Sequence, residues 1–120
     1  VDTVRRAMEL PNVVGVKDSS GDMIYFDQLR QLVAERPDFS LLIGPEELMA
    51  EAVLLGAHGG VNGGANIWPE LYVELHKAAA AGNLDRTTKL HRKLVHLPRR
   101  SSGCFRSPGH QDRPVDPRHL

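Results

Sequence analysis

One lysine of this sequence is placed where it could act as a nucleophile. Lys17 ends the apolar run 13–16 and is followed at once by the polar cluster 18–22. A lysine at the end of a packed strand is partly desolvated, which favours the neutral amine, and a neutral amine can attack a carbonyl carbon to form a Schiff base. Taken alone, the residue favours the other interpretation, in which the ammonium group simply reaches solvent from the strand end.

The glycine-rich segment 59–64 is a second candidate for chemistry. Its main-chain N–H groups could hold a phosphate, although tight packing of a strand against a helix is the commoner reason for such glycines and is favoured here. His58, His76 and His91 lack metal-ligand spacing with cysteines or acids, so we expect no metal site and no cofactor.

These candidates lie at the ends of alternating strand and helix patterns. Short apolar runs rich in β-branched residues predict strands, and longer segments of helical period predict helices between and after them. Because these runs do not alternate between apolar and polar residues, we expect the strands to be buried on both faces of a parallel sheet. The expected strands span 12–17, 39–44 and 59–62, and the expected helices span 1–10, 23–35, 46–55, 69–81 and 84–95. Asp2 is a candidate cap of the first helix, and Asp18 and Ser20 are candidate caps of the second.

The number of expected strands limits which folds are possible. A closed (β/α)8 barrel needs eight βα units and about 250 residues, and an open three-stranded sheet would leave apolar edges unpaired. We therefore expect an α/β fold that is part of a TIM barrel, made of about three βα units. The carboxyl ends of parallel barrel strands share one face, which places Lys17, Gly44, Glu46 and the glycine-rich segment around a common mouth.

Composition divides the chain into two regions. The whole sequence has 41% hydrophobic and 25% charged residues with a formal net charge of zero, which suggests no particular partner. Residues 1–95 hold 10 Lys and Arg against 13 Asp and Glu, or −3, whereas residues 96–120 hold 5 Arg against 2 Asp, or +3. Periodic patterning also stops at residue 96. We expect a packed region, 1–95, and an unstructured tail, 96–120, whose composition suggests an out-of-frame or fused segment.

Nucleic acid and membranes are not expected as partners. The arginines of the tail are scattered and no set of aromatic residues accompanies them for base stacking. The single Cys104 allows no disulfide within the chain, and the sequence shows neither a membrane-spanning stretch nor a signal-peptide pattern. A cytoplasmic location is the resulting expectation, although a sequence that begins inside a longer protein would have lost such a signal.

Three separate motifs follow the expected strands in order. They are GVKDSSGD at 15–22, LIG at 42–44, and GAHGGVN at 56–62 with AN at 65–66 and a proline at 69. Together they resemble the dihydrodipicolinate synthase and N-acetylneuraminate lyase family of class I aldolases. The resemblance covers 1–95 and implies the C-terminal part of the barrel, with the strands as its sixth, seventh and eighth. It implies that Lys17 forms the Schiff base with pyruvate or another 2-oxo acid. Val61 falls where main-chain groups of the eighth strand face the carboxylate end of bound pyruvate.

The resemblance also implies a mechanism and a quaternary structure. An iminium on Lys17 would act as an electron sink, so that a neighbouring C–C bond breaks or forms through an enamine. In the family a Gly-Thr-Thr loop holds the carboxylate and a strand-end tyrosine relays protons, and this chain contains neither. Tyr25 and Tyr72 fall in expected helices, so neither is assigned to the relay. Members of the family form homotetramers.

The residues after the seventh strand bear on the substrate. Sialic acid lyases tend to carry an acid directly after the strand-end glycine, whereas this chain has Pro45 after Gly44, which argues against sialic acid. Gly44 and Glu46 are candidate substrate-binding residues. Glu46 could instead serve the dipole of the helix it begins, and this second interpretation is favoured.

The leading hypothesis is a fragment of a Schiff-base-forming lyase or aldolase, similar to 4-hydroxy-tetrahydrodipicolinate synthase or a related aldolase, with poor activity in isolation. The alternative is a non-catalytic remnant of a partial barrel from a truncated or frameshifted gene. A third hypothesis, a phosphate-binding barrel piece, predicts binding of phosphate esters that survives the substitution Lys17→Ala.

Overall fold

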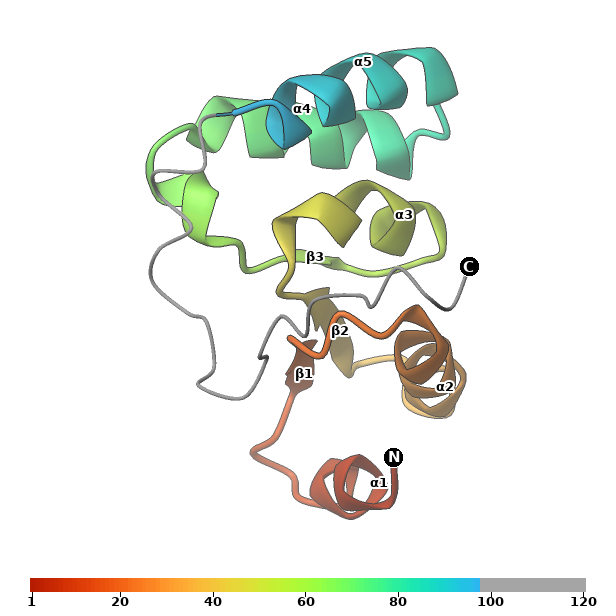
Figure 1. Ribbon diagram of the computed structural model, residues 1–120. Coiled ribbons are helices and arrows are strands. Elements are labelled where there is room, and N and C mark those ends of the chain that lie inside the picture. The colour runs from red at the N-terminus through yellow and green to blue at the C-terminus, as the bar shows by residue number, and fades with distance from the viewer. Residues whose placement is uncertain (98–120) are drawn as a thin grey trace, which may run out of the picture.

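The computed structural model describes residues 1–97 and shows strands and helices in alternation along the chain (Figure 1). The βα alternation expected from the hydrophobic pattern is confirmed, although each strand is shorter than expected. The α-helices, 3-10 helices and strands are α1 Asp2–Met8, β1 Gly15–Asp18, α2 Met23–Val33, β2 Ser40–Ile43, η1 Glu46–Leu48, α3 Met49–Leu54, β3 Gly59–Gly60, η2 Gly63–Asn66, α4 Pro69–Ala80 and α5 Leu84–Val95.

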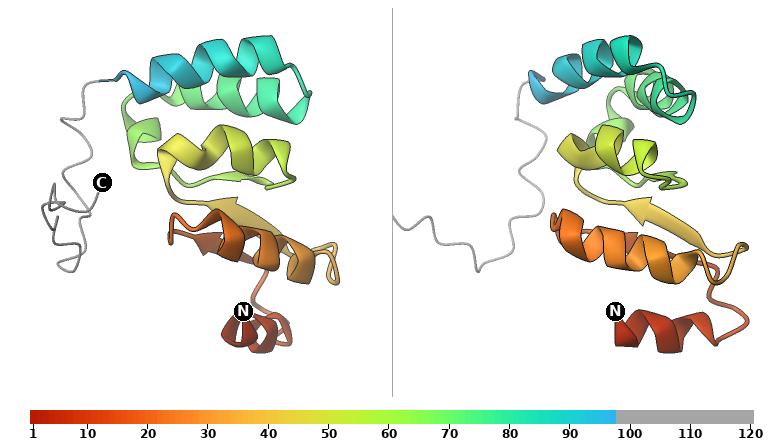
Figure 2. Two further views of the ribbon diagram at one scale, coloured as in Figure 1. Left: turned by 45° about the vertical axis from the view of Figure 1, so that its right-hand side comes forward. Right: turned by 90° about the vertical axis from the view of Figure 1, so that its right-hand side faces the viewer.

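The strands form one parallel sheet in the order β1-β2-β3. Val16 lies opposite Leu41, and Leu42 lies opposite Gly59. Figure 1 shows α2 and α3 on the same side of this sheet, and the right panel of Figure 2 shows both helices in front of the strands. Because the strands are parallel, their carboxyl ends meet at one edge of the sheet.

The hydrophobic core lies between the sheet and the helices on this side. Leu41 and Ile43 of β2 are 1% and 0% exposed, and they belong to the same buried cluster as Phe26 and Leu29 of α2. Phe26 and Leu29 are spaced so that both side chains fall on one face of the helix. Leu75 of α4, also 0% exposed, extends the cluster beyond α3.

The opposite face of the sheet is not covered by residues 1–97. Ser40 and Leu42 alternate with the buried residues of β2 and are only partly buried. Lys17 lies opposite Leu42 and is exposed. The expectation of strands buried on both faces is therefore wrong for this chain, because the helices of the described region pack on one face only.

The helix caps also differ from expectation. Asp22 is the N-cap of α2, and its Oδ1 accepts hydrogen bonds from Ile24 N at 2.8 Å and Tyr25 N at 3.1 Å. Asp18 and Ser20 instead shape the preceding turn: Asp18 Oδ1 accepts from Ser20 N, and Ser20 Oγ accepts from Asp22 N. The expected cap at Asp2 is likewise wrong.

Asp2 lies in the first turn of α1, after the N-cap residue Val1. Further along, the expected helix 46–55 divides into η1 and α3. The expected helix 84–95 coincides with α5, which Asn83 caps by accepting a hydrogen bond from Arg86 N. Both views in Figure 2 show α5 packed along α4.

The end of α5 marks the limit of the described region. His96 is the C-cap residue of α5, and Leu97 N donates to Leu94 O. These two residues begin the expected tail 96–120, and the rest of that tail lies outside the described residues. Among the helices of residues 1–97, none combines the length and the apolar composition needed to cross a bilayer.

Candidate functional site

Lys17 and Gly44 are brought together at the carboxyl ends of β1 and β2. The left panel of Figure 2 shows the three strands ending on the same side, where η1 and η2 begin. A Cβ atom built on Gly44 would lie only 3.0 Å from Cε of Lys17 and would overlap the hydroxyl of Ser19. The lysine side chain thus lies against Gly44, and only glycine leaves room for this arrangement.

The environment of Lys17 differs from the expectation. The sequence predicts a partly desolvated amine at the end of a packed strand, whereas the structure shows an exposed side chain on the uncovered face of the sheet. The physical reason is that residues 1–97 supply no layer over this face. The burial that would favour a neutral amine is therefore not provided by the described part of the chain.

Val61 can offer only one of its main-chain groups to a ligand. Its N–H donates to the carbonyl oxygen of Ile43 at 2.9 Å, so this donor is occupied in joining the end of β3 to β2. Within residues 1–97 no group donates a hydrogen bond to the carbonyl oxygen of Val61, which remains as an acceptor. An acceptor suits an O–H or N–H group of a ligand and does not suit an ionised carboxylate.

Asn62 fixes the segment after β3, which the sequence placed at the common mouth without assigning a role to this side chain. The residue is 7% exposed, and its Nδ2 donates to Gly44 O at 2.8 Å and to Ile43 O at 3.4 Å. The signal available in the sequence was a polar residue directly after an apolar strand end. Its partners could not be read from the sequence because they lie on the neighbouring strand.

Glu46 uses both carboxylate oxygens on groups of its own chain. Its Oε1 accepts from Gly64 N at 2.8 Å, and its Oε2 accepts from the hydroxyl of Tyr72. Gly64 is buried, and a Cβ atom there would overlap the Tyr72 hydroxyl. A carboxylate that occupies an N–H group of the glycine-rich segment also repels anions, which weighs against the phosphate-binding interpretation of 59–64.

Tyr72 lies behind the strand ends, on the helix α4. The residue is 4% exposed, and burial together with the hydrogen bond to Glu46 raises the pKa of Tyr72 above the ordinary value of about 10. The hydroxyl therefore stays protonated and acts as a donor at neutral pH. The expectation that Tyr25 and Tyr72 lie in helices is confirmed, since they belong to α2 and α4.

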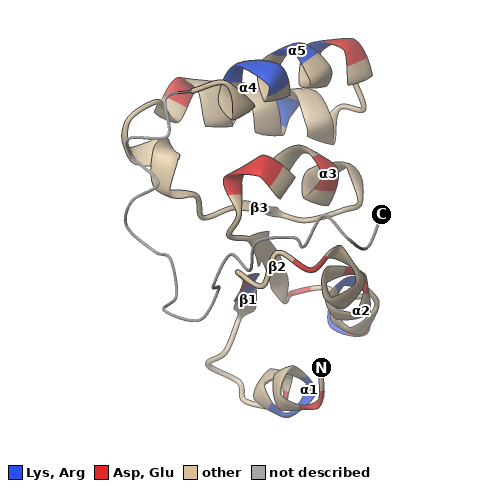
Figure 3. Ribbon diagram, viewed as in Figure 1, with Lys and Arg blue, Asp and Glu red and all other residues tan. Residues whose placement is uncertain are grey.

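Acidic groups gather at this edge of the sheet. Figure 3 shows acidic positions at η1 and in the turn between β1 and α2. Asp18 is 3% exposed and has one oxygen bonded to Ser20 N, while its Oδ2 has no hydrogen-bond partner within residues 1–97. Asp18 and Lys17 point to opposite faces of β1 because side chains alternate along a strand.

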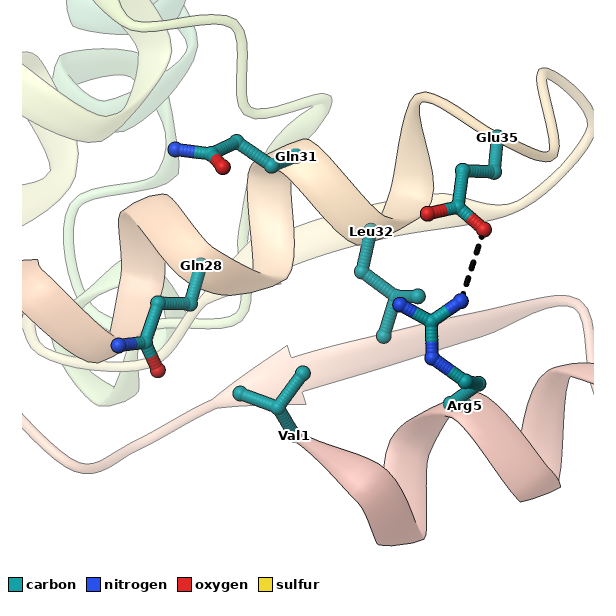
Figure 4. Close-up of a pocket in the computed structure, with 6 residues that line it drawn as sticks. All are labelled: Val1, Arg5, Gln28, Gln31, Leu32 and Glu35. Carbon is teal, nitrogen blue, oxygen red and sulfur yellow. Dashed lines mark hydrogen bonds and ion pairs between the residues drawn. The ribbon is translucent and has the colours of Figure 1, made fainter.

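A hollow elsewhere in the molecule does not include any of these residues. It has a volume of about 390 Å³ and lies between α1 and α2 (Figure 4). Arg5 and Glu35 form an ion pair of 2.9 Å at its rim. Because none of the candidate residues lines this hollow, we do not assign it to the site. Its lining residues are Val1, Arg5, Gln28, Gln31, Leu32 and Glu35.

Comparison with known proteins identifies a family match over most of the chain. The model of the Dihydrodipicolinate synthetase family matches residues 1–102. The 4-hydroxy-tetrahydrodipicolinate synthase of Dechloromonas aromatica is 36% identical over 99 residues, which cover 82% of this chain and 33% of that protein. The chain thus spans about a third of the length of the curated relatives it matches.

Solved structures show the same partial match. The dihydrodipicolinate synthase of Bacteroides thetaiotaomicron superimposes with a TM-score of 0.76 at 51% identity, over 78% of this chain and 32% of that chain. The 2-keto-3-deoxygluconate aldolase of Sulfolobus, in a complex with D-KDPG, superimposes with a TM-score of 0.63 at 28% identity, over 74% of this chain and 29% of that chain. The three parallel strands therefore align with part of the barrel of such enzymes.

Proposed function

From the premise that this chain belongs to the dihydrodipicolinate synthetase family, we propose that it is part of a Schiff-base-forming lyase or aldolase. The family expected from the sequence motifs is thereby confirmed. Under the proposal, residues 1–95 are the C-terminal part of the barrel and β1, β2 and β3 are its sixth, seventh and eighth strands. The substrate is pyruvate or another small 2-oxo acid.

The observation that carries the proposal is the position of Lys17. The lysine is the last residue but one of β1, on the uncovered face of the sheet, and it lies against Gly44 at the carboxyl end of β2. Barrel enzymes build their active sites at the carboxyl ends of the strands. A lysine at this place can reach a carbonyl carbon held over the strand ends.

Under the proposal, the chemistry begins at Nζ of Lys17. The neutral amine adds to the ketone carbon of the 2-oxo acid, and water leaves to give an iminium. In cleavage, the iminium accepts the electron pair of the C–C bond one carbon away, an aldehyde leaves as its hydroxyl proton passes to a base, and the enamine then takes up a proton at carbon to become the product iminium. In condensation, loss of the C–H proton to a base gives the enamine, which attacks an aldehyde whose oxygen takes up the proton and so gives the product iminium. The amine is regenerated when water hydrolyses the product iminium.

Two main-chain positions would orient the substrate. Gly44 leaves space beside the amine, and the carbonyl oxygen of Val61 accepts a hydrogen bond from an O–H or N–H group formed during the reaction. The substrate carboxylate needs donors, and neither of these positions supplies them. A carboxylate-binding loop and a proton-relaying tyrosine would therefore have to come from outside this chain.

The substrate class follows from the relatives and from one local feature. The Dechloromonas protein is a 4-hydroxy-tetrahydrodipicolinate synthase, and the Sulfolobus aldolase structure contains D-KDPG. Pro45 removes both a side-chain acceptor and a main-chain donor next to Gly44, which disfavours recognition of a long polyhydroxylated substrate. We therefore propose a synthase-like or related aldolase activity on short 2-oxo acids, assembled into the homotetramer of the family.

The exposure of Lys17 favours a second candidate, a non-catalytic remnant. Lys17 is exposed, and residues 1–97 supply no layer that would enclose the nucleophile together with a substrate. The 120-residue chain is expected to react with pyruvate slowly, if the proposal holds, and not at all if the chain is a remnant.

Borohydride trapping separates the two candidates. The chain is incubated with pyruvate and sodium borohydride, which delivers hydride to the imine and fixes the adduct as a secondary amine. Peptide mass mapping then compares Lys17 with Lys77, Lys89 and Lys93, which serve as internal references. An adduct concentrated on Lys17 and lost in Lys17→Ala supports the enzyme. Labelling spread evenly over the lysines, or none, identifies an inactive remnant.

A further inference from the structure

The carboxylate of Glu46 joins three segments that are far apart in the sequence. Glu46 begins η1 after β2, Gly64 lies in η2 after β3, and Tyr72 lies in the first half of α4. Gly64 N donates to one carboxylate oxygen at 2.8 Å and the Tyr72 hydroxyl donates to the other. We call these three residues the Glu46 bridge.

The donors of the bridge suit a carboxylate. A main-chain N–H and a phenol hydroxyl both point at Glu46, and hydrogen bonds to a charged acceptor are stronger than those between neutral groups. Burial raises the pKa of Tyr72, so its hydroxyl keeps the proton that it donates. Gly64 has no room for a side chain because a Cβ atom would overlap the Tyr72 hydroxyl and the carboxylate. Each of the three residues therefore has the property that the bridge requires: an acceptor at Glu46, an unhindered N–H at Gly64 and a protonated hydroxyl at Tyr72.

The segment after β3 is therefore held at two places. At its start, Val61 N donates to Ile43 O and Asn62 Nδ2 donates to Gly44 O. At its end, Gly64 N is held by Glu46. The carbonyl oxygen of Val61 lies between these two anchors. It follows β3, which neighbours β2 with Gly44 at its end, and β2 in turn neighbours β1, which carries Lys17.

We propose that Glu46 is a positioning residue, which with Tyr72 fixes the segment 61–64 and thereby sets where the Val61 carbonyl oxygen faces the substrate on Lys17. This inference rests on the proposed function for its second half only. It differs from both interpretations offered by the sequence, in which Glu46 contacts substrate or, in the favoured interpretation, serves the dipole of the helix it begins. A carboxylate with both oxygens occupied by its own chain has little capacity left for a ligand, and releasing it would leave the Gly64 N–H and the Tyr72 hydroxyl without their acceptor.

The first experiment tests the bridge without reference to activity. Amide hydrogen exchange of the ¹⁵N-labelled chain is followed by NMR in the wild type, Glu46→Ala, Glu46→Gln and Glu47→Gln. Glu46→Ala is expected to speed exchange at the Gly64 amide by about tenfold, the factor that corresponds to loss of one typical hydrogen bond. Amides in α2 should be unchanged. Glu46→Gln keeps an oxygen for Gly64 N and offers an N–H to the Tyr72 oxygen, so it should keep most of the protection.

Glu47→Gln is the matched control. Glu47 is exposed and is the next residue in the chain, so this substitution removes the same charge close by without touching the bridge. It should leave the Gly64 amide as in the wild type. If Glu46→Ala leaves exchange at Gly64 unchanged, or if Glu47→Gln changes it as much, the bridge does not fix the segment and the inference is wrong.

The second experiment measures the effect on the site. Trapping rates with cyanoborohydride are measured over a range of pyruvate concentrations for the same variants and for Tyr72→Phe. We expect Glu46→Ala and Tyr72→Phe to raise the pyruvate concentration at half-maximal rate, the former by about tenfold. The maximal rate should change less. Reductive methylation of Lys17 by formaldehyde, whose one-carbon adduct is too small to need orientation by the Val61 carbonyl oxygen, should proceed as in the wild type. Glu46→Gln should restore pyruvate trapping.

The two experiments keep the inference and the proposed function distinguishable. Without pyruvate trapping in the wild type, the proposed function fails for this chain, and the exchange result alone decides whether Glu46 positions the segment 61–64. If trapping occurs and Glu46→Ala alters the choice between 2-oxo acids while Gly64 keeps its protection, Glu46 contacts the substrate and the inference is overturned.

Discussion

The titration of Tyr72 depends on how α4 packs against η1, where its hydroxyl donates to Glu46. Burial and the Glu46 carboxylate raise its pKa, so the folded chain holds the phenol proton more tightly than the unfolded chain does. The stability linked to Tyr72 is therefore present below the unfolded pKa of about 10 and is lost as the pH rises through the folded pKa.

The difference between the folded and unfolded pKa of Tyr72 can be measured by tyrosinate absorbance in a Tyr25→Phe background, which leaves Tyr72 as the sole tyrosine. The native chain should titrate at higher pH than the chain unfolded in urea. Glu46→Gln should lower the titration midpoint of the native chain because a neutral amide no longer disfavours the tyrosinate. A native midpoint at or below that of the unfolded chain would contradict the hydrogen bond between Tyr72 and Glu46.

A second prediction for a single residue concerns Gly44. A methyl group at this position would overlap the Ser19 hydroxyl and lie 3.0 Å from Cε of Lys17. Gly44→Ala should therefore displace the lysine and lower the rate of pyruvate trapping at least tenfold, which corresponds to about 1.4 kcal/mol. Gly59→Ala is the control because its nearest neighbour, Leu42 Cδ2, lies at an ordinary 3.7 Å. Equal trapping by Gly44→Ala and the wild type would show that this contact does not place Lys17.

How much of the site could be predicted depends on the range of its contacts. Lys17 and Gly44 were identifiable because each is a strand-end residue in a local motif. The partners of Glu46 were not identifiable, since Gly64 and Tyr72 are 18 and 26 residues away and meet it only through the packing of α4 on the strand ends. The helix-dipole interpretation of Glu46 used the local sequence alone and overlooked both hydrogen bonds.

Elements were predicted well where one local signal dominates. Asn83 and the helical period define α5, and its bounds agree with expectation. The turn before α2 offers several side chains that can cap a helix, and the choice among them depended on the chain reversal at Gly21, whose φ is 75°. The strands were predicted too long because residues 12–14 and 61–62 lie outside the paired register.

The cap of α2 gives a prediction at the scale of the element. Asp22→Ala removes the acceptor for two N–H groups and should lower the free energy of unfolding by about 1 kcal/mol. Asp22→Asn keeps an acceptor oxygen and should cost less. Urea unfolding followed by circular dichroism measures the difference, provided that the transition is cooperative. A smaller effect for Ala than for Asn would contradict the role of Asp22 as the cap.

At the scale of the whole molecule, the described chain is a layer of helices on one face of a small sheet. The family enzymes it matches are about three times as long, and the aligned strands are part of a barrel. The uncovered face carries Lys17 and Leu42, and β1 and β3 are both edge strands of the described sheet. Unpaired edges and an open face favour self-association. The sequence predicted this partial barrel because the number of βα units can be counted, whereas the exposure of single residues depends on the missing layer.

The two faces of β2 provide the last prediction. Leu41 is 1% exposed in the core, whereas its neighbour Leu42 is only partly buried and lies outside the core cluster. Leu41→Ala should lower the free energy of unfolding by about 2–5 kcal/mol, enough to unfold a small domain of marginal stability. Leu42→Lys should leave the fold intact and reduce both self-association in sedimentation experiments and binding of the dye ANS, because it places a charge on the open face. If Leu42→Lys unfolds the chain as Leu41→Ala does, the second face of the sheet is covered in solution, and the chain forms an assembly that buries Lys17 as well.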